Sequence, residues 1–367
     1  MKRPIIYFLC CAMLLGLLCG CVPQKAEQPP TTAPTEPSTA PTTEPTTEPT
    51  TEPTTPPEPP EPQPVYYTLS FAGDCTLGTD YDVYGMPHTF VGMVGDNYSY
   101  PFEHTLPYFE NDDFTLINLE GTFTDSTEHR DKIYCFRGPY TYSKILTAGS
   151  IEAVSFANNH AQDFGETGYQ DTKSSLEAEG ITYVEQWKTA LYTTKSGLTI
   201  GLYADMQPNN KSHMQQQIAQ LREAGAEIVI ASFHWGFELW YQPTAEQVDF
   251  GHAAIDAGAD IVFGHHPHVL QPIEEYNGGV IYYSLGNFSF GGNRNPKDKD
   301  SVVIQQTVIR DVDGTIRLGD TTAIPFCVSE YSDHNNYKPI PYEVGSEAYE
   351  RTLQKLNITS TKEDAQN

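Results

Sequence analysis

Short apolar runs alternate with stretches of helical periodicity through most of this chain. The helical pattern predicts helices at 141–148, 166–179, 212–224 and 244–257. Ser212 is the expected N-cap of the third helix, and Thr244 begins a sequence that fits a capping box in the fourth. Because strand-like runs follow several of these helices, the pattern favours parallel βαβ units and an α/β fold.

Five apolar runs read as strands, and two of them nearly repeat each other. GAEIVIASFHWG and GADIVFGHHPH each follow a predicted helix, and the other three are contained in YYTLSFAGD, DDFTLINLEG and SIEAVSFANNH. The residues at their ends are polar: Asp74, Glu120, Asn159-His160, His234 and His265-His266-Pro267-His268. In open α/β sheets, ligands bind at the carboxyl ends of the strands. We therefore expect these side chains to converge on one edge of the sheet.

The histidines at 265–268 have several readings, because a single histidine in a globular domain is most often structural. His266 and His268 are two positions apart, so both side chains would leave a strand on the same side, which favours metal binding. His265 would point the opposite way and support the structure or the ligands. Histidine, carboxylate and amide ligands suit Mn²⁺, Zn²⁺ or Fe²⁺. One such ion is expected, or two about 3.5–4 Å apart.

The charge and cysteine content limit the binding partners and the disulfide bonds that are expected. The formal net charge is −27, from 21 Lys and Arg against 48 Asp and Glu, so no basic face is expected for nucleic acid or anionic lipid. Only Cys75, Cys135 and Cys327 lie in the expected domain. These cysteines allow one disulfide at most, with one thiol left over, and give no disulfide framework.

The N-terminal region reads as an export signal followed by a spacer. Residues 1–21 combine Lys2 and Arg3, a short apolar run and the sequence Leu18-Cys19-Gly20-Cys21, which resembles a lipoprotein signal with lipid on Cys21. An ordinary signal peptide with incidental cysteines is the alternative. Residues 22–64 are almost entirely Pro, Thr and Glu, which predicts a disordered, extended stalk. The folded domain is then expected at 65–342, with a polar tail at 343–367.

Seven stretches, in order, resemble the CapA family of capsule and poly-γ-glutamate synthesis proteins, whose domain is similar to calcineurin-type metallophosphatases. They are FAGDCTLG, INLEGTFT, FRGPY, SFANNHAQDFGETG, SFHWGFE, GADIVFGHHPHVLQP and YYSLGNFSF. The resemblance implies a four-layer fold, a β-sandwich covered by helices, with the site at one end. The metal ligands that it implies are Asp74, Glu120, Asn159, His234, His266 and His268. Thr76 stands where the metallophosphatase pattern has a histidine, so one tight and one weak metal are an alternative to a full two-metal centre.

Two further residues receive functional roles. His160 is expected to protonate a leaving group near neutral pH. Arg137, in the FRGP sequence, is the candidate clamp for a carboxylate or phosphate of the substrate.

Together these features predict a lipoprotein anchored on the outer face of a bacterial membrane. It would act in the synthesis, export or anchoring of an anionic surface polymer such as poly-γ-glutamate, alongside membrane synthase subunits and without nucleic acid. The enzyme hypothesis is hydrolysis or transfer at a phosphoester or amide bond. The alternative is a non-catalytic scaffold that binds the polymer through metal. A third hypothesis, an adhesin or solute receptor, rests only on the anchor and stalk.

Overall fold

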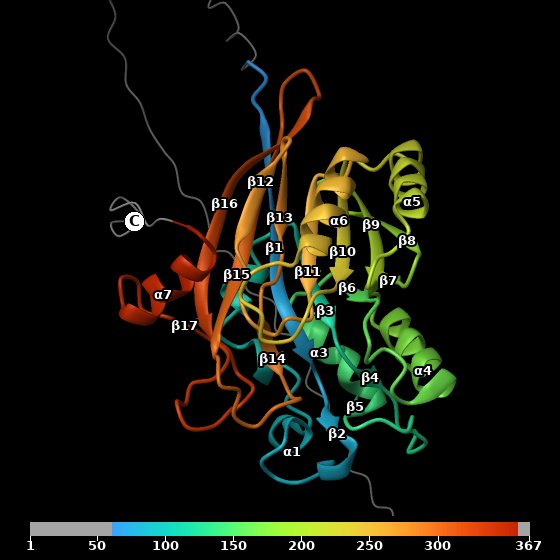
Figure 1. Cartoon of the computed structure of the whole chain (residues 1–367), viewed down its shortest axis with the longest axis vertical. Helices are drawn as coiled ribbons and strands as arrows, with labels where there is room; N and C mark the ends of the chain where they lie inside the picture. The colour runs from blue at the N-terminus through green and yellow to red at the C-terminus, as the bar shows by residue number, and fades with distance from the viewer. Residues whose placement is uncertain (1–60, 359–367) are drawn as a thin grey trace, which may run out of the picture. The chain divides into compact units, whose positions relative to one another are not determined.

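The computed structural model describes residues 61–358 (Figure 1). The predicted signal peptide with Cys21, most of the predicted stalk and the end of the predicted tail lie outside the described residues. The strands are β1 (Val65–Thr76), β2 (Thr79–Asp80), β3 (Phe114–Leu119), β4 (Thr122–Phe123), β5 (Phe136–Gly138), β6 (Ala153–Phe156), β7 (Thr182–Glu185), β8 (Thr189–Thr193), β9 (Thr199–Met206), β10 (Ile228–His234), β11 (Ile261–His265), β12 (Ile273–Tyr276), β13 (Gly279–Tyr282), β14 (Asn287–Phe290), β15 (Asp300–Arg310), β16 (Ile316–Cys327) and β17 (Ile340–Pro341). The α-helices are α1 (Phe90–Val94), α2 (Leu106–Phe109), α3 (Ser143–Ala148), α4 (Gly165–Ala178), α5 (Lys211–Glu223), α6 (Ala245–Asp256) and α7 (Glu347–Lys355).

Most strands belong to two sheets. The first, here the β1 sheet, has the order β17-β16-β15-β1-β3-β6-β7, with β14 also paired to β1. The second, the β10 sheet, has the order β12-β13-β11-β10-β9-β8. β1, β3, β6 and β7 run parallel, as do β9, β10, β11 and β13. The predicted parallel βαβ units are therefore present, but they are divided between two sheets.

The two sheets pack face to face, and helices cover their outer faces (Figure 1). Between the sheets, the ring of Phe71 in β1 lies 5.2 Å from that of Phe263 in β11. Helices α1 to α4 contribute buried side chains to a core on the outer face of the β1 sheet. Helices α5 and α6 do the same for the β10 sheet, through residues such as Leu221 and Ala254. The result is a four-layer α/β arrangement.

The predicted helices agree with the observed ones to within two residues, but one cap was wrong. Thr244 forms the predicted capping box with Gln247. At α5 the N-cap is Asn210, whose side chain accepts a hydrogen bond from the backbone N–H of His213, and not Ser212. The turn at Asn277-Gly278 joins β12 and β13, with both residues at positive φ as a tight hairpin requires.

The predicted polar tail from residue 343 contains an ordered helix. Helix α7 is capped by Ser346, and Leu353 and the following Leu356 are buried. Two of its basic side chains, Arg351 and Lys355, form ion pairs with Asp300 at the start of β15. This segment therefore packs on the folded domain.

The three domain cysteines are free thiols, and Cys75 and Cys135 are buried. No disulfide joins any two of them. Within residues 61–358, no helix has the length and apolar character needed to cross a bilayer.

Candidate metal centre

Asp74 lies at the centre of a buried polar cluster where β1 nears its end. Its backbone N–H donates to the carbonyl of Gly286 over 2.8 Å. The two backbone segments approach so closely that a Cβ on Gly73 would lie 2.0 Å from the carbonyl oxygen of Gly286, so only glycine fits at this position. The carboxylate of Asp74 is fully buried and accepts a hydrogen bond of 2.9 Å from the side chain of Asn118.

Two histidines at the end of β11 and in the turn after it complete the environment of Asp74. Nδ1 of His268 lies 3.1 Å from Oδ2, and Nδ1 of His265 lies 3.3 Å from Oδ1. The backbone N–H of His266 also donates to Oδ2, over 3.3 Å. His265 is buried beside Asp74, so this ring and His268 face the same carboxylate.

Glu120 follows β3 and faces the same cluster. Its Oε1 lies 3.7 Å from Nε2 of His234, at the end of β10, and 3.9 Å from Nε2 of His268. Glu120 and His234 are both almost completely buried. Carboxylates and histidines from both sheets therefore meet at one end of the sandwich.

His266 and His268 approach Glu120 through a turn and not through a strand. β11 ends at His265, and the next residues adopt left-handed backbone conformations, with φ of +94° at His266 and +57° at His268. Such conformations are costly for residues other than glycine, and they occur most often at functional sites. The expectation that strand alternation aligns these two side chains was wrong, although their convergence was predicted.

The cluster fits a metal ion. One ligand atom from each of Glu120, His266 and His268 lies within 4.8 Å of the others. Both carboxylate oxygens of Glu120, both ring nitrogens of His234 and Nδ1 of His266 are buried without a hydrogen-bond partner. Buried polar atoms are nearly always satisfied, so a group of buried ligand atoms that face one another without hydrogen bonds fits the binding of a cation. Two imidazoles and a carboxylate suit a divalent transition metal.

The electrostatics of the cluster are strongly coupled. Burial favours a higher pKa for Asp74, but the adjacent His265 and His268 rings outweigh this and hold the pKa well below its usual range. Burial raises the pKa of Glu120 to about 8. Burial would lower the pKa of His268, yet Glu120 and Asp74 raise it to about 10. Burial lowers the pKa of His234, which keeps that ring neutral and able to bind a metal.

His160 lies at the edge of this cluster and is held by a carboxylate. Its Nδ1 lies 2.7 Å from Oδ2 of Asp163. Asp163 also accepts hydrogen bonds from Nζ of Lys132 and from the backbone N–H of Phe136, both at 2.7 Å. The imidazole packs against the ring of Phe136 at 4.5 Å. Because a carboxylate accepts from Nδ1–H, the other nitrogen, Nε2, remains available to exchange a proton.

The structure does not place Asn159 in the cluster. Asn159 is exposed, and its carbonyl accepts a hydrogen bond from Lys132. The neighbouring Asn158 is buried, and its side chain donates to Asn118 and to the carbonyl of Leu119. The prediction that Asn159 is a ligand is therefore wrong, because the turn after β6 directs Asn158 inward.

Arg137 does not face the cluster either. It is 7% exposed, donates to the carbonyl of Thr124 over 3.1 Å and lies 3.9 Å from the centre of the Tyr84 ring. Its neighbour in β5, Phe136, is the residue that touches His160. Since adjacent strand residues point to opposite sides, Arg137 faces away from the site and does not fit the predicted clamp.

Sequence reasoning missed several polar residues of the site. Asp163 was within the quoted stretch SFANNHAQDFGETG, three positions after His160, where the spacing could have suggested a partner. Asn287 lies in the stretch YYSLGNFSF and accepts from Nδ1 of His268 at 3.0 Å. No local pattern distinguishes Asn287 from an ordinary hairpin asparagine. Its role depends on the pairing of β14 with β1.

Comparison with known proteins gives the family. A family model described as bacterial capsule synthesis protein PGA_cap matches residues 68–292. The chain belongs to the PGA_cap family. This confirms the resemblance found in the sequence.

Individual relatives of this PGA_cap chain are moderately similar. It is 33% identical over 228 residues to the PGA biosynthesis protein CapA of Bacillus subtilis (strain 168), covering 56% of this chain and 60% of that protein. It is 29% identical over 267 residues to the capsule biosynthesis protein CapA of Bacillus anthracis, covering 65% and 63%. A probable polyglutamine synthesis accessory protein of Mycobacterium tuberculosis is 30% identical over 226 residues, covering 52% and 60%. The match thus spans a little over 60% of the length of these relatives at most.

Solved structures are more distant from this PGA_cap chain. The NAD nucleotidase NadN of Haemophilus influenzae aligns with a TM-score of 0.42 and 12% identity, covering 80% of this chain and 56% of that one. Purple acid phosphatase PPD1 of yellow lupin aligns with a TM-score of 0.31 and 9% identity, covering 81% and 57%.

Proposed function

We propose that this protein acts in capsule or poly-γ-glutamate synthesis, export or anchoring through a divalent-metal centre that hydrolyses or transfers a phosphoester or amide bond. The observation behind the proposal is the set of buried, unpaired ligand atoms on Glu120, His234 and His266, next to the His160–Asp163 pair. The choice of polymer rests on the names of the relatives, which are a PGA biosynthesis protein and a capsule biosynthesis protein. The metal would be Mn²⁺, Zn²⁺ or Fe²⁺.

The residues of the site would have two roles, metal binding and proton donation. Glu120, His266 and His268 would hold the ion, and Asp74 fixes His268 through Nδ1. When bound, such an ion polarises the reacting bond and lowers the pKa of a coordinated water. His160 lines the cavity beside the ligands and is oriented by Asp163, so it is placed to give a proton from Nε2 to a leaving group.

The location and partners form part of the same proposal. A lipid on Cys21 and the stalk at 22–64 would hold the domain outside the membrane, beside the synthase subunits that make the polymer. The test is Cys21→Ala in cells. Release of the variant into the medium, or retention of its signal peptide, supports the anchor, and unchanged membrane retention with normal processing contradicts it.

A scaffold that binds polymer through metal without catalysis is the second candidate. It is favoured by the small number of ligands, since Glu120, His266 and His268 form the one such three-residue group found among residues 61–358. Thr76, fully buried after Asp74, offers no imidazole for a second ion.

His160 distinguishes the two candidates. Removing a general acid costs about 10²–10⁴ in rate, whereas a scaffold does not need the proton. We expect a strain carrying only His160→Ala to lose surface polymer while the purified variant keeps its metal. His252→Ala is the matched control, because His252 is a partly exposed histidine paired with Glu274. Normal polymer production by His160→Ala, with metal retained, would favour the scaffold.

A further inference from the structure

A cavity of about 590 Å³ lies beside the metal centre. Its lining includes His160, His268 and Asn287, and the segment between β14 and β15 supplies Arg294 and Lys297. Its volume is in the range of pockets that hold small ligands or one end of a longer one. Two cations therefore border the space in which a substrate would meet the metal.

The backbone that carries these two cations is fixed at both ends. Asn335 is 2% exposed, and its backbone N–H donates to the carbonyl of Arg294 over 2.7 Å. The side chain of Asn335 donates to the carbonyls of Phe290 and Asn293 at 2.9 and 3.0 Å. After Lys297, the side chain of Asp298 is bound by Tyr241 and Lys355. The loop is thus held in place independently of any ligand.

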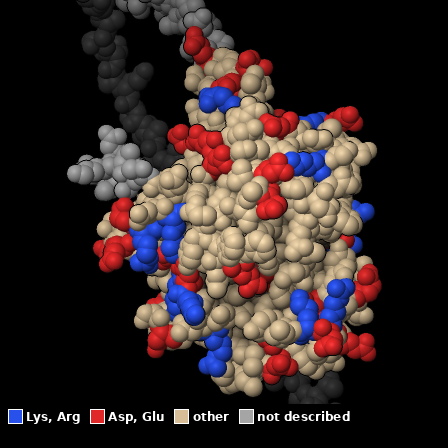
Figure 2. Space-filling model, in the orientation of Figure 1, with Lys and Arg blue, Asp and Glu red and all other residues tan. Residues whose placement is uncertain are grey.

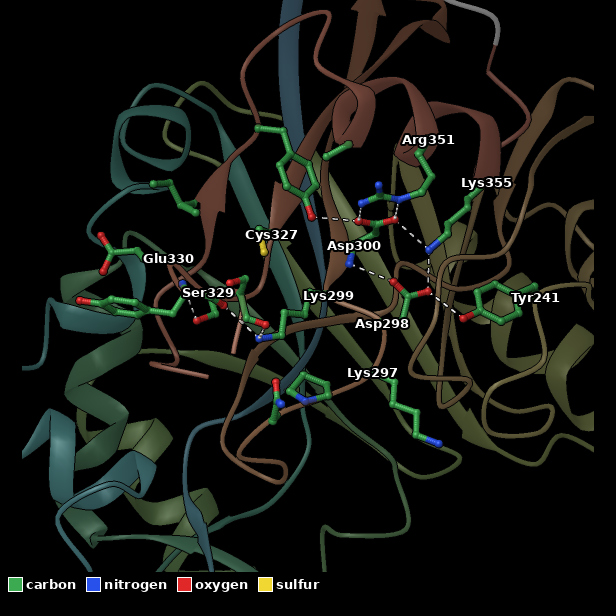
Figure 3. A pocket seen from close by; sticks show the side chains of 17 residues that line it. Tyr241, Lys297, Asp298, Lys299, Asp300, Cys327, Ser329, Glu330, Arg351 and Lys355 are labelled. Atoms are coloured by element: carbon green, nitrogen blue, oxygen red, sulfur yellow. Dashed lines mark hydrogen bonds and ion pairs between the residues drawn. The ribbon is translucent and has the colours of Figure 1, made fainter. Parts of the chain in front are cut away.

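The other basic side chains nearby are already used by the fold. Lys299 donates to three carbonyls, those of Tyr331, Ser332 and His334. Arg351 and Lys355 are paired with Asp300, as Figure 3 shows. In the same view Lys297 extends away from this network with no bond to it. Basic side chains also gather beside α7 on the face seen in Figure 2, with acidic side chains among them.

Arg294 and Lys297 differ from these paired cations. Both are exposed, and neither side chain makes a hydrogen bond or ion pair with the described part of the chain. In a chain with a net charge of −27, opposite charges for pairing are abundant. Two unpaired cations from one segment of the cavity lining are therefore available to an incoming anion.

We propose that Arg294 and Lys297 form an anion-binding subsite that holds a carboxylate or phosphate group of the ligand while its reacting bond lies at the metal centre. This inference rests on the proposed function, because it uses the same cavity. The planar guanidinium of Arg294 suits both oxyanions, and Lys297 adds a point charge. Asp80, Glu238 and Asp298 also line the cavity. Asp298 is bound by Tyr241 and Lys355, and Asp80 accepts hydrogen bonds from two backbone N–H groups, so the held group lies closest to Arg294 and Lys297.

The subsite takes over the role that the sequence suggested for Arg137. Arg137 is buried against Tyr84 and does not line the cavity. The two cations also reduce the repulsion between an acidic protein and a polyanion at the position where the two must meet.

Binding is measured by calorimetry on the full chain loaded with Mn²⁺, so that the result does not depend on turnover. The probes are a γ-linked glutamate oligomer, the same oligomer with its free carboxylates amidated, and inorganic phosphate. The test variant is Arg294→Ala with Lys297→Ala. The matched control is Lys188→Ala with Lys195→Ala, which removes two exposed cations that do not line the cavity.

We expect the wild-type chain to bind the acidic oligomer or phosphate, and the test variant to bind that probe about tenfold or more weakly. The probe that is affected identifies a carboxylate or a phosphate ligand. The control should remain within about twofold of wild type, because exposed charges at a distance are screened. The amidated oligomer should not distinguish the variants.

Equal binding by the test and control variants would overturn the subsite, and so would a wild-type chain that binds neither anion. Metal content, measured on the same samples, keeps this result separate from the proposed function. A wild-type chain that takes up no metal refutes the metal centre, while titration of the anions still decides the subsite.

Discussion

His268 and Glu120 hold protons that a metal ion must displace. In the metal-free chain the pKa of His268 is raised to about 10, chiefly by Glu120 and Asp74 acting against burial. Burial raises the pKa of Glu120 to about 8. At neutral pH the Glu120–His268 pair therefore holds at least one proton. Because a metal takes neutral imidazole and ionised carboxylate, its binding is coupled to proton release.

This coupling predicts the pH dependence of metal binding. We expect Mn²⁺ uptake near neutral pH to release about one to two protons, and affinity to rise as the pH increases toward the pKa of Glu120. Calorimetry in buffers with different ionisation enthalpies measures the protons directly. His252→Ala should behave like wild type, since this ring lies outside the cluster. Uptake without proton release would show that Glu120 and His268 are not the ligands.

The sequence predicted which residues belong to the site better than it predicted the directions of their side chains. Asp74, Glu120, His234, His266 and His268 were found because polar residues at the ends of apolar runs are recognisable, and the structure brings them together. Their role as ligands remains a prediction. The choice between Asn158 and Asn159 depends on the backbone path after β6, which no local pattern contains. The same is true of the left-handed residues after β11.

Among the elements, helix α7 is held partly by ion pairs to Asp300. Asp300 is buried, and its carboxylate binds Arg351 through two hydrogen bonds of 2.7 and 2.6 Å. Burial favours a higher pKa for Asp300, but the hydrogen bonds from Arg351 and Lys355 outweigh this and lower it. The contribution to stability is therefore present above the unfolded-state pKa, near 4, and is lost as the pH falls through the folded-state value.

We expect Asp300→Asn to lower the free energy of unfolding by about 1–3 kcal/mol near neutral pH. The difference from wild type should shrink as the pH falls below about 4 and disappear once the pH passes the lowered pKa of Asp300 in the folded chain. Urea unfolding of both proteins near neutral pH and below about pH 4 measures this difference in the free energy of unfolding. Asp249→Asn is the control, because Asp249 pairs with Lys211 on the surface, where such pairs contribute about 0–1 kcal/mol. An Asp300→Asn variant as stable as this control would contradict the role of Asp300.

The same helix shows why some elements escaped prediction. Hydrophobic periodicity identified α4, α5 and α6, whose apolar faces pack on the sheets. Helix α7 also has an apolar face, with Leu353 and the following Leu356 buried, but that face is short and lies among charged residues. The polar composition of residues 343–367 therefore led to the prediction of a tail and not of a packed helix.

At the scale of the whole molecule, the site is formed where the β1 sheet and the β10 sheet meet. The sequence predicted parallel βαβ units but placed all five strand ends on one sheet edge. The structure puts Asp74 and Glu120 on the β1 sheet, and His234 and His265 on the β10 sheet. Which strands pair is a long-range property, as the pairing of β1 with β14 and β15 shows. Only the family resemblance implied the sandwich.

A metal that binds across the two sheets should stabilise the whole domain. An ion that binds only the folded state adds about 2.7 kcal/mol when its concentration is 100 times Kd. We therefore expect a chelator to lower the Tm of the wild-type chain and added Mn²⁺ or Zn²⁺ to restore it. A melting curve that is insensitive to both would show that the cluster is structural.

The most direct test of the metal centre is elemental analysis of the purified full chain beside a His266→Ala, His268→Ala variant. The account predicts about one equivalent of a divalent transition metal in the wild-type chain and none in a variant that retains its circular dichroism spectrum. Wild-type protein without metal after purification in metal-supplemented buffer, or a folded variant that keeps its metal, would contradict the account.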